Sequence, residues 1–105
     1  MIRSVLYLQP RDGNAKAVAD MYQRSGVLED AAALEGCLGA ELQLPIDEPG
    51  PVLVTALWRD PAAYQTWVDS PVRAAHGEEL GKLIEAEPGP EMQGRLYEIV
   101  VEAGT

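Results

Sequence analysis

The spacing of hydrophobic positions along the chain predicts four strands and two helical regions. Residues 2–8, 52–58 and 96–101 are short runs with apolar side chains on both alternating sets of positions, and residues 37–44 are apolar at every second position. Between these strands, apolar residues recur at helical spacing over residues 15–34 and 61–84. The predicted order is therefore strand, helix, strand, strand, helix, strand.

Residues that favour helix ends support this division. Asp12 or Asn14 could cap the first helical region, and Gly26 would weaken or kink it. The second region is expected to begin at Asp60-Pro61, because Asp is a good capping residue and Pro suits the first helical position. Ser70-Pro71 is expected to break this region and redirect the chain.

This order is typical of an α+β, ferredoxin-like βαββαβ domain, in which an antiparallel sheet carries helices on one face. The 105 residues suffice for one such domain, residues 1–105. Because several of the strands are apolar on both faces, the face without helices would expose a large apolar patch in a monomer. We therefore expect a homodimer in which two sheets pack face to face.

Composition narrows the choice of partners. The net charge is −9, from 17 acidic and 8 basic side chains, which argues against nucleic acid and against an anionic membrane surface. No apolar run approaches the roughly 20 residues that span a bilayer, and we expect no signal peptide. Cys37 is the only cysteine and has no partner for an internal disulfide, which favours a cytoplasmic protein.

The residues with the clearest chemical potential follow the third predicted strand. The only histidine, His76, lies on an apolar helical stripe, and Tyr64 and Trp67 precede it at helical spacing. An imidazole can serve as a base or as a metal ligand near neutral pH. The alternative, that all three side chains only pack in the core, stays open. Gly77 and Gly81, one helical turn apart, would allow either a close helix-to-sheet approach or room for a flat ligand.

Other familiar motifs are missing from the sequence. A zinc site would need more Cys or His residues, and neither a Gly-rich phosphate loop nor a Gly-x-Ser-x-Gly motif is present. No metal, flavin or nicotinamide is therefore implied by a motif. The nearby acidic residues are expected to form a solvated face rather than a catalytic pair: Glu78, Glu79, Glu85 and Glu87.

The run LWRDPAAYQTWVDSPVRAAH, residues 57–76, resembles the antibiotic-biosynthesis-monooxygenase family. In that family a strand ending in Trp is followed by a polar turn, an aromatic residue, a Trp or apolar residue, and Ser-Pro. The residues at those places here are Trp58, Tyr64, Trp67, Ser70 and Pro71. EGCLGAELQ, residues 35–43, is similar to the family's entry into its second strand. The resemblance implies a dimeric α+β barrel.

Two branches of the family suggest different activities. In bacterial haem-degrading monooxygenases, a Trp at the place of Trp67 presses on the porphyrin and a His at the place of His76 ligates the iron. Those enzymes also carry an Asn on the first strand, where this chain offers Ser4 or Tyr7 instead. The second branch oxidises planar aromatic polyketides such as anthrones with O2 and no bound organic cofactor.

The leading hypothesis is a monooxygenase of this second kind. It implies stacking walls from Trp58 and Trp67, and hydrogen bonds from Tyr64 and Tyr7. His76 or Arg73 would stabilise an enolate. The residues expected to be catalytic are His76, Trp67 and Tyr64, and those expected to bind substrate are Trp58, Tyr7 and Arg73. The alternatives are a haem-degrading monooxygenase acting through His76, and a non-catalytic or cyclase-like dimer that binds a small molecule.

Overall fold

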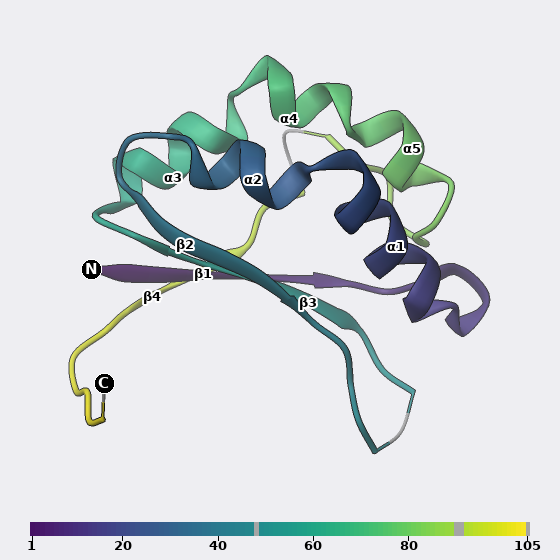
Figure 1. Ribbon diagram of the computed structural model, residues 1–105, viewed down its shortest axis with the longest axis horizontal. Helices are drawn as coiled ribbons and strands as arrows, with labels where there is room; N and C mark the ends of the chain where they lie inside the picture. Colours follow the sequence, from purple (N-terminus) through teal and green to yellow (C-terminus); the bar gives the residue numbers. More distant parts are fainter. Residues whose placement is uncertain (48, 90–91, 105) are drawn as a thin grey trace.

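The computed structural model describes residues 1–47, 49–89 and 92–104, and these form one antiparallel sheet with helices on one face (Figure 1). The strand order is β2-β3-β1-β4. The strands are β1 Ile2–Leu8, β2 Cys37–Gln43, β3 Val52–Trp58 and β4 Arg95–Glu98. Neighbouring strands are antiparallel throughout. The predicted α+β, ferredoxin-like βαββαβ fold is confirmed.

The helical layer consists of short segments rather than two continuous helices. A 3-10 turn at Arg11–Gly13 precedes the first of them. The helices are α1 Ala15–Ser25, α2 Val27–Ala32, α3 Pro61–Val68, α4 Pro71–Ala75 and α5 Gly77–Gly81. All of them lie above the same face of the sheet, and no helix of the described residues covers the opposite face (Figure 1).

The predicted helix boundaries are confirmed by their caps. The side chain of Asn14 accepts a hydrogen bond from the Ala17 amide at 3.2 Å, and Asp60 caps α3 in the same way, with an Oδ1 to amide distance of 2.9 Å. Ser70 caps α4, where its hydroxyl oxygen accepts a hydrogen bond from the Val72 amide at 3.1 Å. Gly26 separates α1 from α2 because its φ of 72° is left-handed, a conformation that glycine adopts without strain.

The last strand is shorter than predicted. It was expected over residues 96–101 but ends at Glu98, because its partner on β1, Ile2, is the first residue of that strand. Beyond this pair the Ile99 amide donates a hydrogen bond to the Met1 carbonyl at 3.1 Å. Val100 and Val101, predicted to lie in the strand, are therefore exposed.

A β-bulge changes the expected pattern of β2. The alternation predicts that Leu38 shares a face with Ala40 and Leu42, but the register with β3 shifts between Cys37 and Gly39. The extra residue in the bulge is Leu38, whose side chain is 53% exposed. The apolar face of β2 is therefore formed by Ala40 and Leu42.

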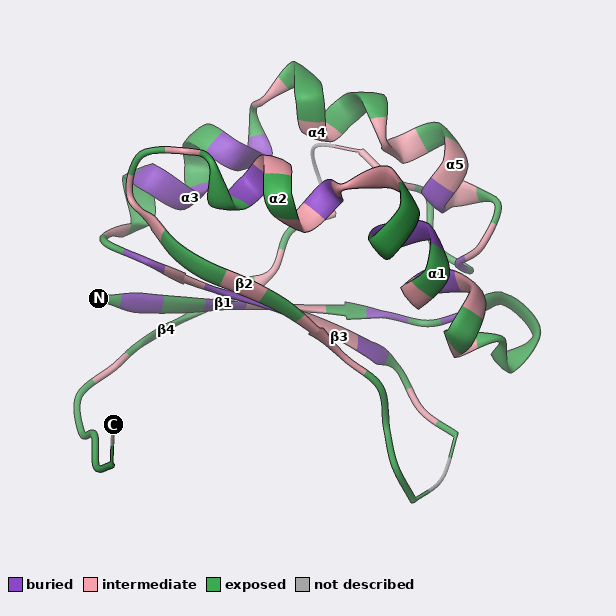
Figure 2. Cartoon of the chain, in the orientation of Figure 1, coloured by how far each residue is buried: buried purple, intermediate pink, exposed green. Residues whose placement is uncertain are grey.

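The core lies between the helices and the inner face of the sheet, where the buried residues face each other (Figure 2). On β1 the inward-facing Ile2 and Leu8 are buried, whereas Arg3 and Tyr7 on the other face are exposed. Alternate strand positions point to opposite faces, so one set of β1 side chains lies in the core and the other at the surface, as the sequence predicts. None of the helices described is long and apolar enough to cross a membrane.

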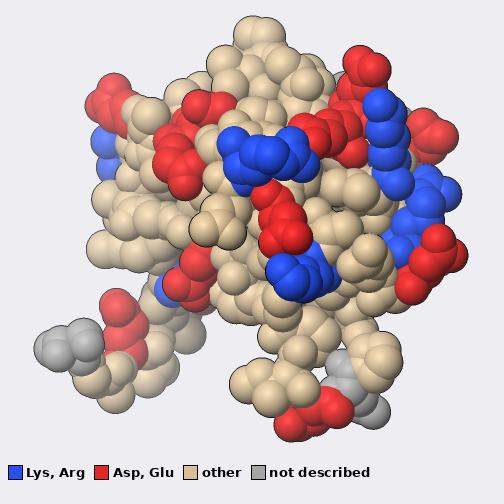
Figure 3. All heavy atoms as spheres, turned by 45° about the vertical axis from the view of Figure 1, so that its right-hand side comes forward, with Lys and Arg blue, Asp and Glu red and all other residues tan. Residues whose placement is uncertain are grey.

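Charges of both signs are interspersed over the face shown in Figure 3 rather than segregated. One ion pair links α1 to α5, with 2.7 Å between Arg24 Nη1 and Glu79 Oε2. Ser25 Oγ donates to the same carboxylate at 3.1 Å. The hydrogen bond from Arg24 is the main reason that the pKa of Glu79 is lowered from its ordinary value. These contacts fix the first helix against the last one.

Candidate functional site

A cavity of about 740 Å³ lies between the helices and the sheet. Its floor is formed by strands β1, β2 and β3, and its walls come from α1 to α5 together with Pro88, Gly89 and Met92. Cavities of this size in proteins commonly hold small molecules. The cavity is therefore the main candidate for a functional site within the described part of the chain.

Short side chains, in register across three strands, leave space between the sheet and the helices at the floor of this cavity. Ala56 on β3 pairs with Ser4 on β1 and with Ala40 on β2, so the three residues form one row across the sheet. All three line the cavity. Larger side chains in this row would reach toward the helices and fill the space.

Aromatic side chains close one end of the cavity. Trp58 is almost fully buried, and its Nε1 donates a hydrogen bond to Ser4 Oγ at 2.9 Å. Tyr64 packs edge-on against it, with ring centroids 5.5 Å apart and planes at 71°. The Tyr64 hydroxyl accepts from the Gly94 amide at 2.6 Å, which ties α3 to the segment before β4. Trp67 on the same helix also lines the cavity.

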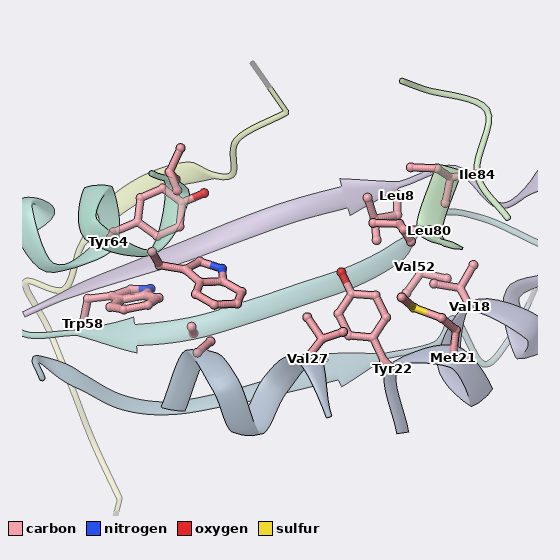
Figure 4. Close-up of a cluster of buried hydrophobic side chains, with 14 of the residues drawn as sticks. Leu8, Val18, Met21, Tyr22, Val27, Val52, Trp58, Tyr64, Leu80 and Ile84 are labelled. Atoms are coloured by element: carbon pink, nitrogen blue, oxygen red, sulfur yellow. The ribbon is translucent and has the colours of Figure 1, made fainter. Parts of the chain in front are cut away.

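Tyr22 places a phenol on the opposite side of the cavity (Figure 4). It comes from α1, where the sequence predicts only a packing role, and its hydroxyl points away from the helix toward the interior (Figure 4). Burial raises the pKa of Tyr22 to about 12, and the positive charge of Arg73 opposes part of that increase. The phenol therefore stays protonated at physiological pH and can donate a hydrogen bond to a ligand.

The single histidine lies between α4 and α5 and lines the cavity. Its Nε2 is 2.8 Å from Oδ2 of Asp30 on α2. The His76 side chain is 19% exposed and that of Asp30 is 42% exposed, so the pair lies at the boundary between cavity and solvent. The contact joins the two helical regions that surround the cavity.

Arg73 and two glycines lie next to residues that follow α5. The Arg73 guanidinium donates to the carbonyl oxygens of Gly89, at 3.4 Å, and Met92. A Cβ at Gly81 would lie 3.2 Å from Pro88, and one at Gly77 would lie 3.5 Å from it. Gly81 therefore comes close to Pro88 rather than to the expected sheet, whereas Gly77 makes only an ordinary contact with Pro88 and lines the cavity, so the alternative of room for a ligand stays open at that position.

Five of the six predicted site residues surround the cavity: Trp58, Tyr64, Trp67, Arg73 and His76. The sixth, Tyr7, lies on the face of the sheet without helices, where its side chain is 53% exposed. Strand alternation explains this position, because Ser4 and Leu6 point inward and Tyr7 outward. Ser4, the other residue considered for that place, does line the cavity.

Two residues of the site were not recognised in the sequence. Tyr22 belongs to the apolar stripe of α1 and has the spacing of an ordinary core residue. Asp30 is one of many acidic residues, and its partner is 46 positions away along the chain. No local pattern could have paired Asp30 with His76, although Tyr22 was a reasonable candidate once its helix was expected to face the sheet.

Known structures share this fold at low sequence identity. SnoaB, a cofactor-independent oxygenase from Streptomyces nogalater, is 17% identical with a TM-score of 0.74, over 96% of this chain and 94% of that one. The haem degrader MhuD from Mycobacterium tuberculosis, solved with two haems in its active site, is 17% identical with a TM-score of 0.69, over 99% and 100%.

A third relative, a protein from Nitrosomonas europaea described as a putative antibiotic biosynthesis monooxygenase, is 9% identical with a TM-score of 0.75, over 96% of this chain and 100% of that one. A search of curated proteins finds no match. The family model for antibiotic biosynthesis monooxygenases matches residues 1–79, which include all the residues predicted for the site. The chain therefore belongs to the antibiotic biosynthesis monooxygenase family.

Proposed function

We propose that the protein is an oxygenase that oxidises a planar aromatic, polyketide-like substrate with O2 and without a bound organic cofactor. The observation that carries this proposal is the cavity of about 740 Å³, which has aromatic side chains at one end and polar ones on its helical side. Trp58 and Trp67 would pack against the ring system, and the low floor beneath them suits a flat molecule. Polar groups of Tyr22 and His76 are available for the substrate oxygens.

An anthrone illustrates the reaction. Loss of one proton gives an electron-rich enolate that reduces O2 directly, so the protein needs only to bind, orient and deprotonate the substrate. One anthrone and one O2 then give one anthraquinone and one water, and no external reductant is required. His76 would accept the proton, while the Tyr22 hydroxyl and the Arg73 charge would stabilise the enolate oxygen.

Haem is the alternative raised by His76 and by the likeness to MhuD. The Nε2 atom of His76 is hydrogen-bonded to the carboxylate of Asp30, so only Nδ1 could ligate an iron atom. The Arg73 guanidinium donates to two backbone carbonyls, which limits its use for a haem propionate. The engaged guanidinium leaves haem without a free basic partner from Arg73, which favours a neutral aromatic ligand.

Oxygen uptake with anthrone tests the proposal. We expect the purified protein, treated with a chelator and given no cofactor, to consume O2 and form anthraquinone. His76→Ala is expected to lower kcat by about 100- to 10,000-fold, the usual contribution of a general base. The exposed neighbour Ala75, changed to Gly, serves as a control that should keep the activity.

Other outcomes would point to the alternatives. Binding of anthraquinone without any O2 uptake would contradict the oxygenase and support a non-catalytic or cyclase-like binding protein. Haemin added to the protein is expected to give no saturable Soret shift. A shift at one haem per chain that is lost in His76→Ala would instead support a haem-degrading monooxygenase.

We also propose that the domain, residues 1–105, acts in the cytoplasm as a homodimer formed through the helix-free face of the sheet. Tyr7 and Tyr97 lie on this face and are 53% and 45% exposed. By its register with β3, Gln43 lies on the same face; its Oε1 is buried and accepts no hydrogen bond from any described residue. A second copy could cover the tyrosines and supply the missing donor.

Size-exclusion chromatography with light scattering tests this assembly. We expect a mass close to twice the 11.3 kDa of the chain, and a shift toward the monomer mass for Tyr7→Asp, which would place a charge in the interface. An unmodified protein that elutes as a monomer at all concentrations would contradict the homodimer.

A further inference from the structure

The contact between Asp30 and His76 has a chemical consequence beyond linking two helices. Oδ2 of Asp30 and Nε2 of His76 are 2.8 Å apart. A carboxylate can only accept hydrogen bonds, so the hydrogen atom of this bond must be carried by Nε2. A neutral imidazole has one protonated nitrogen, and the other ring nitrogen, Nδ1, is then an acceptor. Asp30 therefore selects one of the two neutral forms of His76.

The position of the pair connects this choice to the cavity. His76 lines the cavity and is mostly buried, whereas Asp30 approaches it from α2 and is more exposed to solvent. Among the described residues no other hydrogen bond to the His76 ring is present. The nitrogen that Asp30 leaves unprotonated is therefore available to a hydroxyl group of a bound ligand.

We propose that Asp30 is a positioning residue, which holds His76 in the form whose Nδ1 accepts the proton of a phenolic or enolic hydroxyl in the cavity. This proposal rests on the proposed oxygenase function. In the step, the O–H bond of the substrate, for anthrone that of its enol tautomer, breaks, the bonding electrons stay on oxygen, and the proton forms a bond to Nδ1. The products are a substrate enolate and an imidazolium whose charge is balanced by Asp30.

A purely structural role for the pair predicts different behaviour. Partly exposed ion pairs contribute little to stability, so losing this one would lower the melting temperature slightly and leave the chemistry unaffected. A positioning role predicts instead that the protonated nitrogen of His76 changes. Asp30→Asn distinguishes the two roles, because an amide of the same shape can either accept from Nε2–H or donate to Nε2, so it no longer selects the Nε2–H form.

Nitrogen NMR measures the form of the ring directly. Because His76 is the only histidine, the two ring nitrogens of a 15N-labelled sample need no assignment to a residue. Spectra are recorded at a pH where titration of the same signals shows a neutral ring. We expect the hydrogen on Nε2 in the unmodified protein. The ratio of the Nδ1–H form to the Nε2–H form should rise several-fold in Asp30→Asn and fall part of the way back in Asp30→Glu.

Glu29→Gln is the matched control, because it removes the same charge from an exposed neighbouring position on α2. It is expected to leave the ring form unchanged. A folded Asp30→Asn protein, judged by circular dichroism, with the ring form of the unmodified protein would overturn the proposal. So would an unmodified protein with its hydrogen on Nδ1.

Anthrone turnover separates this proposal from the function on which it rests. We expect Asp30→Asn to lower kcat at least about tenfold with little change in KM, and Glu29→Gln to change neither. A reversed ring form with full turnover would overturn the catalytic part of the proposal. An unmodified protein that lacks turnover but carries the hydrogen on Nε2 would contradict the oxygenase and still support Asp30 as the residue that positions His76.

Discussion

Trp58→Ala is expected to lower the free energy of unfolding by about 3–5 kcal/mol, the usual cost of removing a large aromatic side chain from a core. Trp58 is 1% exposed, packs against Tyr64 and uses its indole nitrogen in a buried hydrogen bond. The loss is large relative to the roughly 5–15 kcal/mol that stabilises a typical domain. Urea denaturation followed by circular dichroism measures it.

A smaller change at the same position isolates the hydrogen bond. Trp58→Phe keeps an aromatic ring but removes the Nε1 donor, which leaves the buried Ser4 hydroxyl without its partner and costs about 1–3 kcal/mol. Ser4→Ala in the Trp58→Phe protein should then be much less destabilising than Ser4→Ala alone. Equal costs of Ser4→Ala in both backgrounds would show that the hydrogen bond contributes nothing measurable.

The sequence was sufficient to predict the fold because local and long-range signals agree. The alternation in residues 2–8, the apolar run of residues 52–58, and the caps at Asn14, Asp60 and Ser70 all favour the elements that form. Consistency of this kind is what specifies one structure. The aromatic spacing after β3 predicted Trp67 and Tyr64 on one helical face, and the structure has both lining the cavity.

The errors concern features that depend on neighbouring strands. Nothing in residues 37–44 indicates that Leu38 forms a bulge, because the shift is defined only by the register with β3. The end of β4 depends likewise on the start of β1 rather than on its own residues, which remain apolar to Val101. Strand ends are set by pairing, and pairing is not a local property of the sequence.

The site was predicted less completely because it is formed between distant segments. The row of Ser4, Ala40 and Ala56 exists only through strand register, and each of these residues is unremarkable in its own segment. The same row explains how a 105-residue domain keeps both a core and a cavity. Trp58 and Tyr64 pack at one end, and Leu8, Val18, Met21, Val52 and Ile84 pack at the other (Figure 4).

This arrangement implies that the small residues of the floor matter more for ligand binding than for stability. Side chains at the two packed ends stabilise the fold, whereas the small residues of the floor leave space between them. An apolar side chain that fills an internal space adds contacts where few exist. The loss of stability is therefore small when the new side chain fits. Binding of a ligand in the same space should be lost.

Ala56→Leu is therefore expected to weaken the binding of anthraquinone at least about tenfold, or about 1.4 kcal/mol, with a much smaller effect on unfolding. Ala56 is in the middle of the row, so the larger side chain would occupy the centre of the floor. Isothermal titration calorimetry measures the affinity, and urea denaturation measures the stability of the same sample.

Ala62→Leu is the matched control, since it adds the same atoms at an exposed position on α3 and should leave the affinity unchanged. Retained affinity in a folded Ala56→Leu protein would mean that the ligand does not lie on this floor, and the proposed site would be wrong. If Ala56→Leu both loses affinity and unfolds, Ala56→Val provides the test, because it adds a smaller side chain. Its effect on binding should still exceed its effect on stability, since the ligand needs the space and the fold does not.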